Sequence, residues 1–99
     1  MALNICLAGA TGWAGSELAR GIAGAEGLKL VSAISRKHAG GTLGEVLGDV
    51  RLDTPVFATA PEALARPVDV FMEYTRPDSA KAHILAALEH GAHVVVGTS

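Results

Sequence analysis

Three glycines follow the first apolar run of the sequence at three-residue intervals, in Gly9-Ala10-Thr11-Gly12-Trp13-Ala14-Gly15. Gly9 permits a tight turn off a strand, and Gly12, which has no Cβ, lets the backbone approach a pyrophosphate. Gly15 lets the next helix close onto the sheet, and the N–H groups at the helix start favour an anion. A purely structural turn could have the same spacing. The position between an expected strand and an expected helix favours nucleotide binding by residues 9–15.

A basic pair lies about twenty residues further on, in Ser35-Arg36-Lys37 at the end of the second apolar run. Folds that bind NAD commonly place Asp or Glu there, where the carboxylate accepts from the ribose 2′-hydroxyl. An acid would repel a 2′-phosphate, whereas Arg36 offers it a planar, charge-assisted grip and Lys37 adds a point charge. The alternative is a solvated basic loop. The segment predicts NADPH as the preferred cofactor and leaves NADH open.

Polar residues also end the fourth and fifth apolar runs, as Glu73-Tyr74-Thr75 and Gly97-Thr98-Ser99. Open α/β sheets bind ligands at the carboxyl ends of their strands. Tyr74 is suited to covering a nicotinamide face, and the backbone of residues 97–99 to binding the carboxamide. By residue type alone, Thr75 is more simply the N-cap of the next helix and Gly97 a strand terminator.

The other reactive side chains indicate little chemistry. Trp13 packs either over the cofactor phosphates or against its own helix. Cys6 lies in an apolar run and is expected to be a small buried residue, not a reactive thiol. The four histidines have no spacing that indicates a metal site, so we expect no metal and expect these residues to be solvated or at helix ends: His38, His83, His90 and His93.

Apolar runs of strand length alternate with helical patterns along the chain. The runs predict strands at residues 3–8, 28–35, 56–58, 68–73 and 94–96, and helical spacing predicts helices at 13–25, 43–47, 61–65 and 75–90. Gly27 and Gly91 are expected to end the two long helices. In the second of these, Thr75 and Asp78 resemble a capping box, and Ile84, Leu85 and Leu88 form an apolar stripe. This order predicts an α/β fold, a Rossmann-like doubly wound parallel sheet with helices on both faces.

The composition is typical of one compact domain. The 99 residues are 49% apolar and 18% charged, which excludes intrinsic disorder. Eight basic and ten acidic residues give a net charge of −2, so no basic field points to nucleic acid or to an anionic membrane. No apolar stretch reaches the ~18 residues of a membrane span, and the N-terminus lacks the cationic segment of a signal peptide. We therefore expect a cytoplasmic protein without a nucleic-acid or membrane partner.

Several segments together resemble the N-terminal domain of dihydrodipicolinate reductase, an NAD(P)H-dependent enzyme of diaminopimelate and lysine biosynthesis. They are the glycine turn, the strand and turn at 68–77, the helix end at 88–91 and the segment 94–99, and they span essentially the whole chain. The resemblance implies that residues 9–14 bind the cofactor pyrophosphate and Arg36 the 2′-phosphate. It also implies that residues 97–99 bind the nicotinamide end, with Ser99 touching the substrate.

The resemblance further implies hydride transfer from NAD(P)H to a cyclic tetrahydrodipicolinate precursor. Residues 1–99 would form the dinucleotide-binding domain. The family's catalytic and substrate-binding residues lie in a second, C-terminal domain that is absent from this chain, so we expect no catalytic residue here and no activity from the isolated chain. The sequence departs from the family pattern at Trp13-Ala14, where the family usually has Arg-Met, at Glu73-Tyr74, where it has Asp-Phe, and near Ser35, where it has an acid.

Two alternatives stay open. The turn at residues 9–13 and the segment 35–40 also resemble N-acetyl-glutamyl-phosphate reductase, although the ends of the fourth and fifth strands fit that family poorly. The other alternative is an NADP-binding module without chemistry of its own. The sequence does not predict an oligomeric state.

Overall fold

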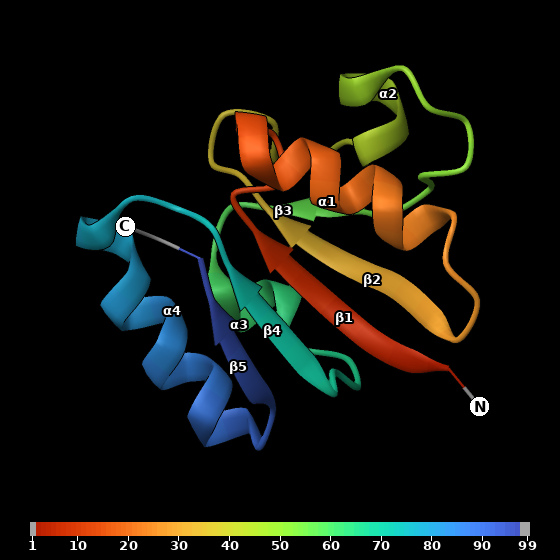
Figure 1. Cartoon of the computed structure of the whole chain (residues 1–99). Helices are drawn as coiled ribbons and strands as arrows, with labels where there is room; N and C mark the ends of the chain where they lie inside the picture. The colour runs from red at the N-terminus through yellow and green to blue at the C-terminus, as the bar shows by residue number, and fades with distance from the viewer. Residues whose placement is uncertain (1, 98–99) are drawn as a thin grey trace.

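The fold is a five-stranded parallel sheet with helices on both faces (Figure 1). The computed structural model describes residues 2–97, apart from the Pro77 side chain. The strands lie in the order β3-β2-β1-β4-β5, with bounds β1 Leu3–Ala8, β2 Leu28–Ile34, β3 Val56–Phe57, β4 Val70–Glu73 and β5 His93–Val96. The helices are α1 Trp13–Ala23, α2 Leu43–Leu47, α3 Ala60–Ala63 and α4 Pro77–His90. The predicted Rossmann-like, doubly wound fold is confirmed.

Strand β1 is buried because its alternate side chains enter two different cores. Ile5 and Leu7 pack in the core that contains Ile22 of α1. Cys6 and Ala8 pack in the core on the opposite face, with residues of β4, α3 and α4. Cys6 is fully buried, as predicted, and burial raises the pKa of its thiol to about 11.

Helix α1 ends two residues earlier than its sequence pattern predicts. Gly24, not Gly27, is the C-cap, and its N–H donates to the carbonyl of Arg20 at 3.3 Å. Gly27 forms the turn into β2 instead, with a φ of +80°. Its carbonyl accepts from the Leu3 N–H at 2.8 Å, which joins this turn to the start of β1.

The predicted apolar stripe of α4 is wrong. Leu85 and Leu88 are 51% and 57% exposed, whereas Ala80 and Ala87 are buried. Helix α4 thus lies against β4 and β5 through small residues, and its leucines extend beyond the contact. None of the helices within residues 2–97 is long and apolar enough to cross a membrane.

The remaining elements begin and end within two residues of their predicted positions. Helix α3 begins at Ala60, before the predicted Pro61, because the Thr59 hydroxyl caps it by accepting from the Glu62 N–H at 3.4 Å. Strand β5 has a single neighbour, β4, so its side chains are more exposed than the continuous apolar run suggests.

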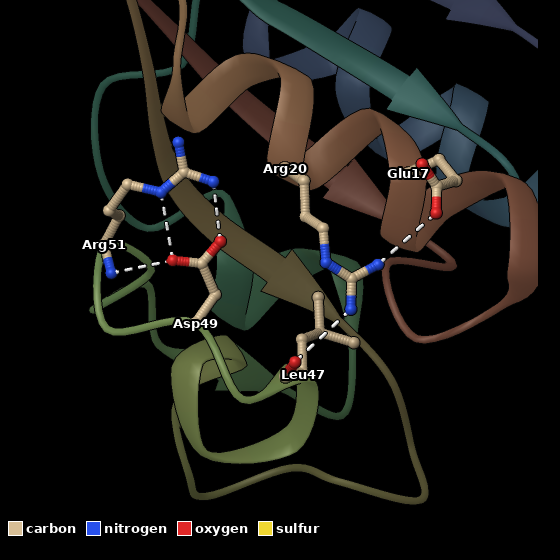
Figure 2. Close-up of polar contacts among 5 residues, drawn as sticks. All are labelled: Glu17, Arg20, Leu47, Asp49 and Arg51. Atoms are coloured by element: carbon tan, nitrogen blue, oxygen red, sulfur yellow. Dashed lines mark hydrogen bonds and ion pairs between the residues drawn. The ribbon is translucent and has the colours of Figure 1, made fainter.

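Polar contacts fasten the segment after β2 to α1 (Figure 2). Arg20 of α1 lies 3.5 Å from the Glu17 carboxylate and donates to the carbonyl of Leu47 at 3.3 Å. Beyond α2, Arg51 donates two side-chain hydrogen bonds to Asp49, at 3.0 and 2.7 Å, and these lower the pKa of Asp49 to about 2. Such surface pairs contribute little to stability.

Substitution of Gly21 by alanine is expected to stabilise the fold. Gly21 lies inside α1, and a Cβ there would meet no atom within 4 Å. Gly21→Ala should therefore raise the free energy of unfolding by about 0.5–1 kcal/mol, because alanine favours the helix. The measurement is denaturant unfolding followed by circular dichroism.

Gly27→Ala is the matched control. A Cβ at Gly27 would also meet open space, but the φ of +80° is unfavourable for alanine. This variant should lose about 1 kcal/mol. Changes of the same sign in both variants would contradict the assigned backbone conformations.

Candidate functional site

A cavity of about 1130 Å³ opens at the carboxyl ends of the strands. Its walls come from the glycine turn after β1, the end of β2, the β3–α3 loop, the β4–α4 turn, the first turns of α4 and Gly97. Small-molecule sites commonly measure roughly 300–1,000 Å³. The cavity therefore has room for an extended ligand. Its place is dictated by topology, because parallel strands bring all their carboxyl ends to one edge of the sheet.

The structure brings most of the predicted site residues to this cavity: Gly9, Gly12, Ala14, Ser35, Arg36, Lys37, Tyr74, Thr75 and Gly97. Within the glycine turn, Ala10 and Gly15 are buried behind the cavity wall, and the Thr11 side chain turns toward β2. Thr98 and Ser99 lie outside the described residues.

Trp13 is 89% exposed at the start of α1. Its predicted alternative of packing against its own helix is therefore wrong. Trp13 is not among the residues that line the cavity, and its packing over a bound phosphate stays a prediction.

Two glycines of the turn are required by backbone contacts. Gly9 has a φ of +84°, and a Cβ on it would overlap the carbonyl of Tyr74. A Cβ on Gly15 would overlap the carbonyl of Gly9. The third glycine thus packs against the backbone at the end of β1, which is the close helix–strand contact that the sequence predicts.

Gly12 differs from its two neighbours. Its φ of −74° and ψ of 171° suit any residue, and a Cβ on it would meet only the Gly9 carbonyl oxygen, at 3.4 Å. Gly12 is also the N-cap of α1, and no side chain caps that helix or places an acid in its first turn. The open Cβ position and the uncapped helix start both face a cavity that suits an anion.

The end of β2 supplies hydroxyl and cationic groups to the same wall. The Ser35 hydroxyl lies 3.2 Å from the Thr11 hydroxyl, which links β2 to the glycine turn. Arg36 and Lys37 follow it, exposed at the mouth of the cavity. Both cations are therefore accessible to an anionic group bound there.

The Glu73 carboxylate organises the turn between β4 and α4. It is fully buried, and it accepts hydrogen bonds from the Thr75 N–H at 3.0 Å, from the Thr75 hydroxyl and from His83 Nδ1 at 2.9 Å. Burial alone raises the pKa of Glu73, but the hydrogen bonds from His83 and Thr75 outweigh it and lower the pKa below its usual value. Glu73 is thus an ionised, buried acceptor.

Two predictions about this turn are wrong. Thr75 is not the N-cap of α4; Arg76 is, without a side-chain cap, because the Thr75 hydroxyl donates to Glu73 instead. His83 is not solvated: its side chain is 15% exposed and lines the cavity. His83 shares a helix face with the buried residues Ala80 and Ala87, and this i, i+3 and i, i+4 spacing is the sequence signal that could have placed it.

The Tyr74 ring lies against the backbone of Gly97. A Cβ on Gly97 would overlap the ring atoms, so only glycine lets Tyr74 lie there. The Gly97 N–H also donates to the carbonyl of Glu73 at 2.9 Å, which continues the β4–β5 pairing past the strand end. Gly97 is thus more than a strand terminator, because it shapes this end of the cavity.

Across residues 2–97, no three His, Cys, Asp or Glu side chains are grouped so that they could hold a metal ion.

Gly12→Ala and Gly15→Ala are expected to differ in stability, because the fold has room for a Cβ at Gly12 and none at Gly15. Gly15→Ala forces an overlap with a backbone carbonyl and should cost about 3 kcal/mol of stability or prevent folding. Gly12→Ala should cost no more than about 1 kcal/mol, the difference between glycine and alanine as an N-cap. Thermal unfolding compares the two variants. Equal losses would contradict the packing of the turn.

Glu73→Gln is expected to destabilise the protein in a pH-dependent way. The folded-state pKa of Glu73 lies below its usual value, so the ionised carboxylate contributes stability above about pH 4.3, the unfolded value, and that contribution is lost as pH falls through the folded pKa. At neutral pH the amide should cost about 1–3 kcal/mol, because it cannot accept all three hydrogen bonds.

The measurement is the free energy of unfolding between pH 7 and pH 3 for both proteins. The difference between wild type and Glu73→Gln should shrink below about pH 4. A constant difference across this range would show that Glu73 is not an ionised acceptor in the fold.

Comparison with known proteins finds one family over nearly the whole chain. The family described as "Dihydrodipicolinate reductase, N-terminus" matches residues 3–99. The 4-hydroxy-tetrahydrodipicolinate reductase of Bacillus cereus (strain ATCC 10987) is 32% identical over 98 residues, which are 98% of this chain and 37% of that relative. The enzyme of the same name from Halalkalibacterium halodurans is 33% identical, with the same coverage. The chain therefore spans little more than a third of these relatives' length.

A solved structure shares the fold. The dipicolinate-bound dihydrodipicolinate reductase from Paenisporosarcina sp. TG-14 superposes with a TM-score of 0.79 at 23% identity, over 100% of this chain and 38% of the other. The superposed part of that structure thus shares the fold of the present chain.

Proposed function

Since the chain belongs to the dihydrodipicolinate reductase family, as the N-terminal domain, we propose that it binds NAD(P)H for the reduction of a cyclic tetrahydrodipicolinate precursor in diaminopimelate and lysine biosynthesis. Because the chain belongs to this family, we reject the alternative of N-acetyl-glutamyl-phosphate reductase, which the glycine turn also resembles. We further propose that NADPH is preferred over NADH.

The observation that carries dinucleotide binding is the open position at Gly12. Gly9 and Gly15 are glycines because the fold leaves no room for a side chain, whereas Gly12 has room and lacks one. The space that a Cβ would take lies on the cavity wall, at an uncapped helix start. A pyrophosphate needs this close approach to backbone N–H groups, so the turn at residues 9–15 is assigned to it.

The preference for NADPH rests on the end of β2. Ser35 stands where an acid would bind a ribose 2′-hydroxyl, and the cations Arg36 and Lys37 follow it on the cavity wall. A guanidinium forms paired, charge-assisted hydrogen bonds with a phosphate. Arg36 is therefore assigned to the 2′-phosphate, with Lys37 as a second positive charge.

The nicotinamide end is assigned to Tyr74 and Gly97, with Thr98 and Ser99 following. Tyr74 is held by Gly97 behind it and by its own backbone, whose N–H donates to Ala8 at 2.9 Å. A fixed aromatic ring can limit the positions of a flat ligand ring and exclude water from one face. Bound NADPH supplies the hydride, and the residues of this chain orient it.

Substrate reduction also needs groups outside residues 1–99. Hydride transfer requires the acceptor carbon to be held near the nicotinamide, and much of the rate comes from that positioning. Glu73, which precedes Tyr74, is buried and accepts hydrogen bonds from Thr75 and His83, so we do not assign it to the substrate. We propose that the substrate site is completed by a second domain.

Arg36→Ala is expected to weaken NADPH binding by about 1.5–3 kcal/mol, the range for a hydrogen bond to a charged group. The affinity for NADH should change little, because NADH has no 2′-phosphate. Titration calorimetry with both cofactors makes the comparison. Lys29→Ala, an exposed lysine of β2 away from the cavity, is the control. Equal losses for both cofactors would show that Arg36 does not contact the 2′-phosphate.

The isolated chain is expected to bind NADPH without oxidising it in the presence of substrate. The test is an absorbance assay with enzymatically generated substrate and a high concentration of the chain. The rate should equal that of the buffer blank. Turnover that disappears in Gly12→Val, which blocks the pyrophosphate position, would show that residues 1–99 carry a complete substrate site.

A further inference from the structure

A second cavity, of about 310 Å³, opens at the amino-terminal edge of the sheet, where the strands begin. Asn4 lines it from the start of β1, residues 29–31 from the start of β2, residues 53–55 from the segment before β3, and Arg66 and Pro67 from the segment before β4. Parallel strands begin at one edge, so these segments meet there (Figure 1). The volume is at the lower end of the range for small-molecule sites and suits a ligand much smaller than a dinucleotide.

Two cationic side chains line this cavity from segments far apart in the sequence. Lys29 is an exposed residue of β2, and Arg66 is a half-buried residue that follows α3. Within residues 2–97, neither cation forms an ion pair with a carboxylate. Asp53 is the one acid on the described walls, and Asp69, outside the walls, accepts from the Asn4 N–H at 2.8 Å. The walls therefore carry a net positive charge, and both cations are available to a ligand.

The Arg66 guanidinium is held in place by an aromatic ring. Its central carbon lies over the Phe57 ring, 4.4 Å from the ring centroid. A guanidinium above a ring directs its N–H groups along its own plane, so this contact leaves them available for hydrogen bonds.

The nitrogen atoms of Arg66 differ in their access to solvent. The Nε atom is buried and has no hydrogen-bond partner in the described part of the chain, whereas the two Nη atoms are not buried. Arg66 is thus a partly desolvated cation without a compensating anion, which is an unfavourable state. A negative charge bound at the accessible Nη–H groups would relieve it.

We propose that this second cavity is a binding site for a small oxyanion, a carboxylate or a phosphate. Paired N–H groups of a guanidinium match two oxygens of one such group, and Arg66 binds it through Nη–H donors. Lys29 adds a point charge from β2. The anion joins the segment after α3 to the start of β2. Because the cofactor cavity lies at the other edge of the sheet, this inference does not rest on the proposed function.

The experiment follows the amide signals of the ¹⁵N-labelled chain by nuclear magnetic resonance during separate titrations with sodium phosphate and sodium acetate. The pH is constant, and sodium chloride keeps the ionic strength constant. Saturable shifts are expected at Lys29, Thr54 and Arg66. Phosphate can also bind at the glycine turn, and shifts at Gly12 report that event separately. Saturation by either anion supports the proposal, and the anion that saturates identifies the class of ligand.

Arg66→Gln removes the paired donors and the charge, so the affinity measured at Lys29 and Thr54 should fall about tenfold or more. Arg36→Gln is the matched control, because it removes an arginine from the cofactor cavity at the other edge, and it should leave that affinity unchanged.

The wild-type titration decides the proposal whether or not the variants fold. Absence of saturable shifts at Lys29 and Thr54 with both anions, up to tens of millimolar, would overturn it. An unchanged affinity in Arg66→Gln would overturn the assignment to Arg66. An equal loss in Arg36→Gln would place the binding event in the cofactor cavity and would likewise overturn the second site.

Discussion

The site depends on the direct contact between two backbone turns. The glycine turn after β1 lies against the β4–α4 turn so closely that Gly9 has no room for a side chain beside Tyr74. The contact follows from the sheet, in which β1 and β4 are parallel neighbours whose pairing continues from Ala8 to Tyr74. Helices α1 and α4 then leave on opposite faces (Figure 1), so neither covers the space above the two strand ends. The cavity is that space.

A buried charge maintains this contact. Burying a carboxylate is costly unless hydrogen bonds replace its water, and Glu73 receives them from the Thr75 backbone, the Thr75 hydroxyl and His83. The first two fix the turn that presses on Gly9, and the third ties that turn to the second turn of α4. One side chain thus sets the positions of the β4 end, the start of α4 and the cavity wall between them.

The features that the sequence predicted are those with local signals. The glycine turn, the basic pair after β2 and the polar ends of β4 and β5 each follow an apolar run, and parallel strands place such ends together. By its sequence position, the Thr75 hydroxyl could accept from a backbone N–H of α4, as a helix cap does, or donate to the Glu73 carboxylate. Its preference for Glu73 depends on how deeply that carboxylate is buried. His83 was missed because its partner lies on another element. The stripe of α4 was misplaced because alanines, less hydrophobic than leucines, fit the narrow contact with the sheet.

The central claim, that residues 9–15, residues 35–37, Tyr74, Thr75 and Gly97 belong to one dinucleotide site, is tested most directly by nuclear magnetic resonance. The ¹⁵N-labelled chain is titrated with NADPH while the amide signals are followed residue by residue. The account predicts saturable shifts at Gly12, Ala14, Arg36, Tyr74 and Gly97, with Lys29 and Arg51 unchanged. Shifts confined to the amino-terminal edge of the sheet, or none at millimolar NADPH in a folded sample, would contradict it.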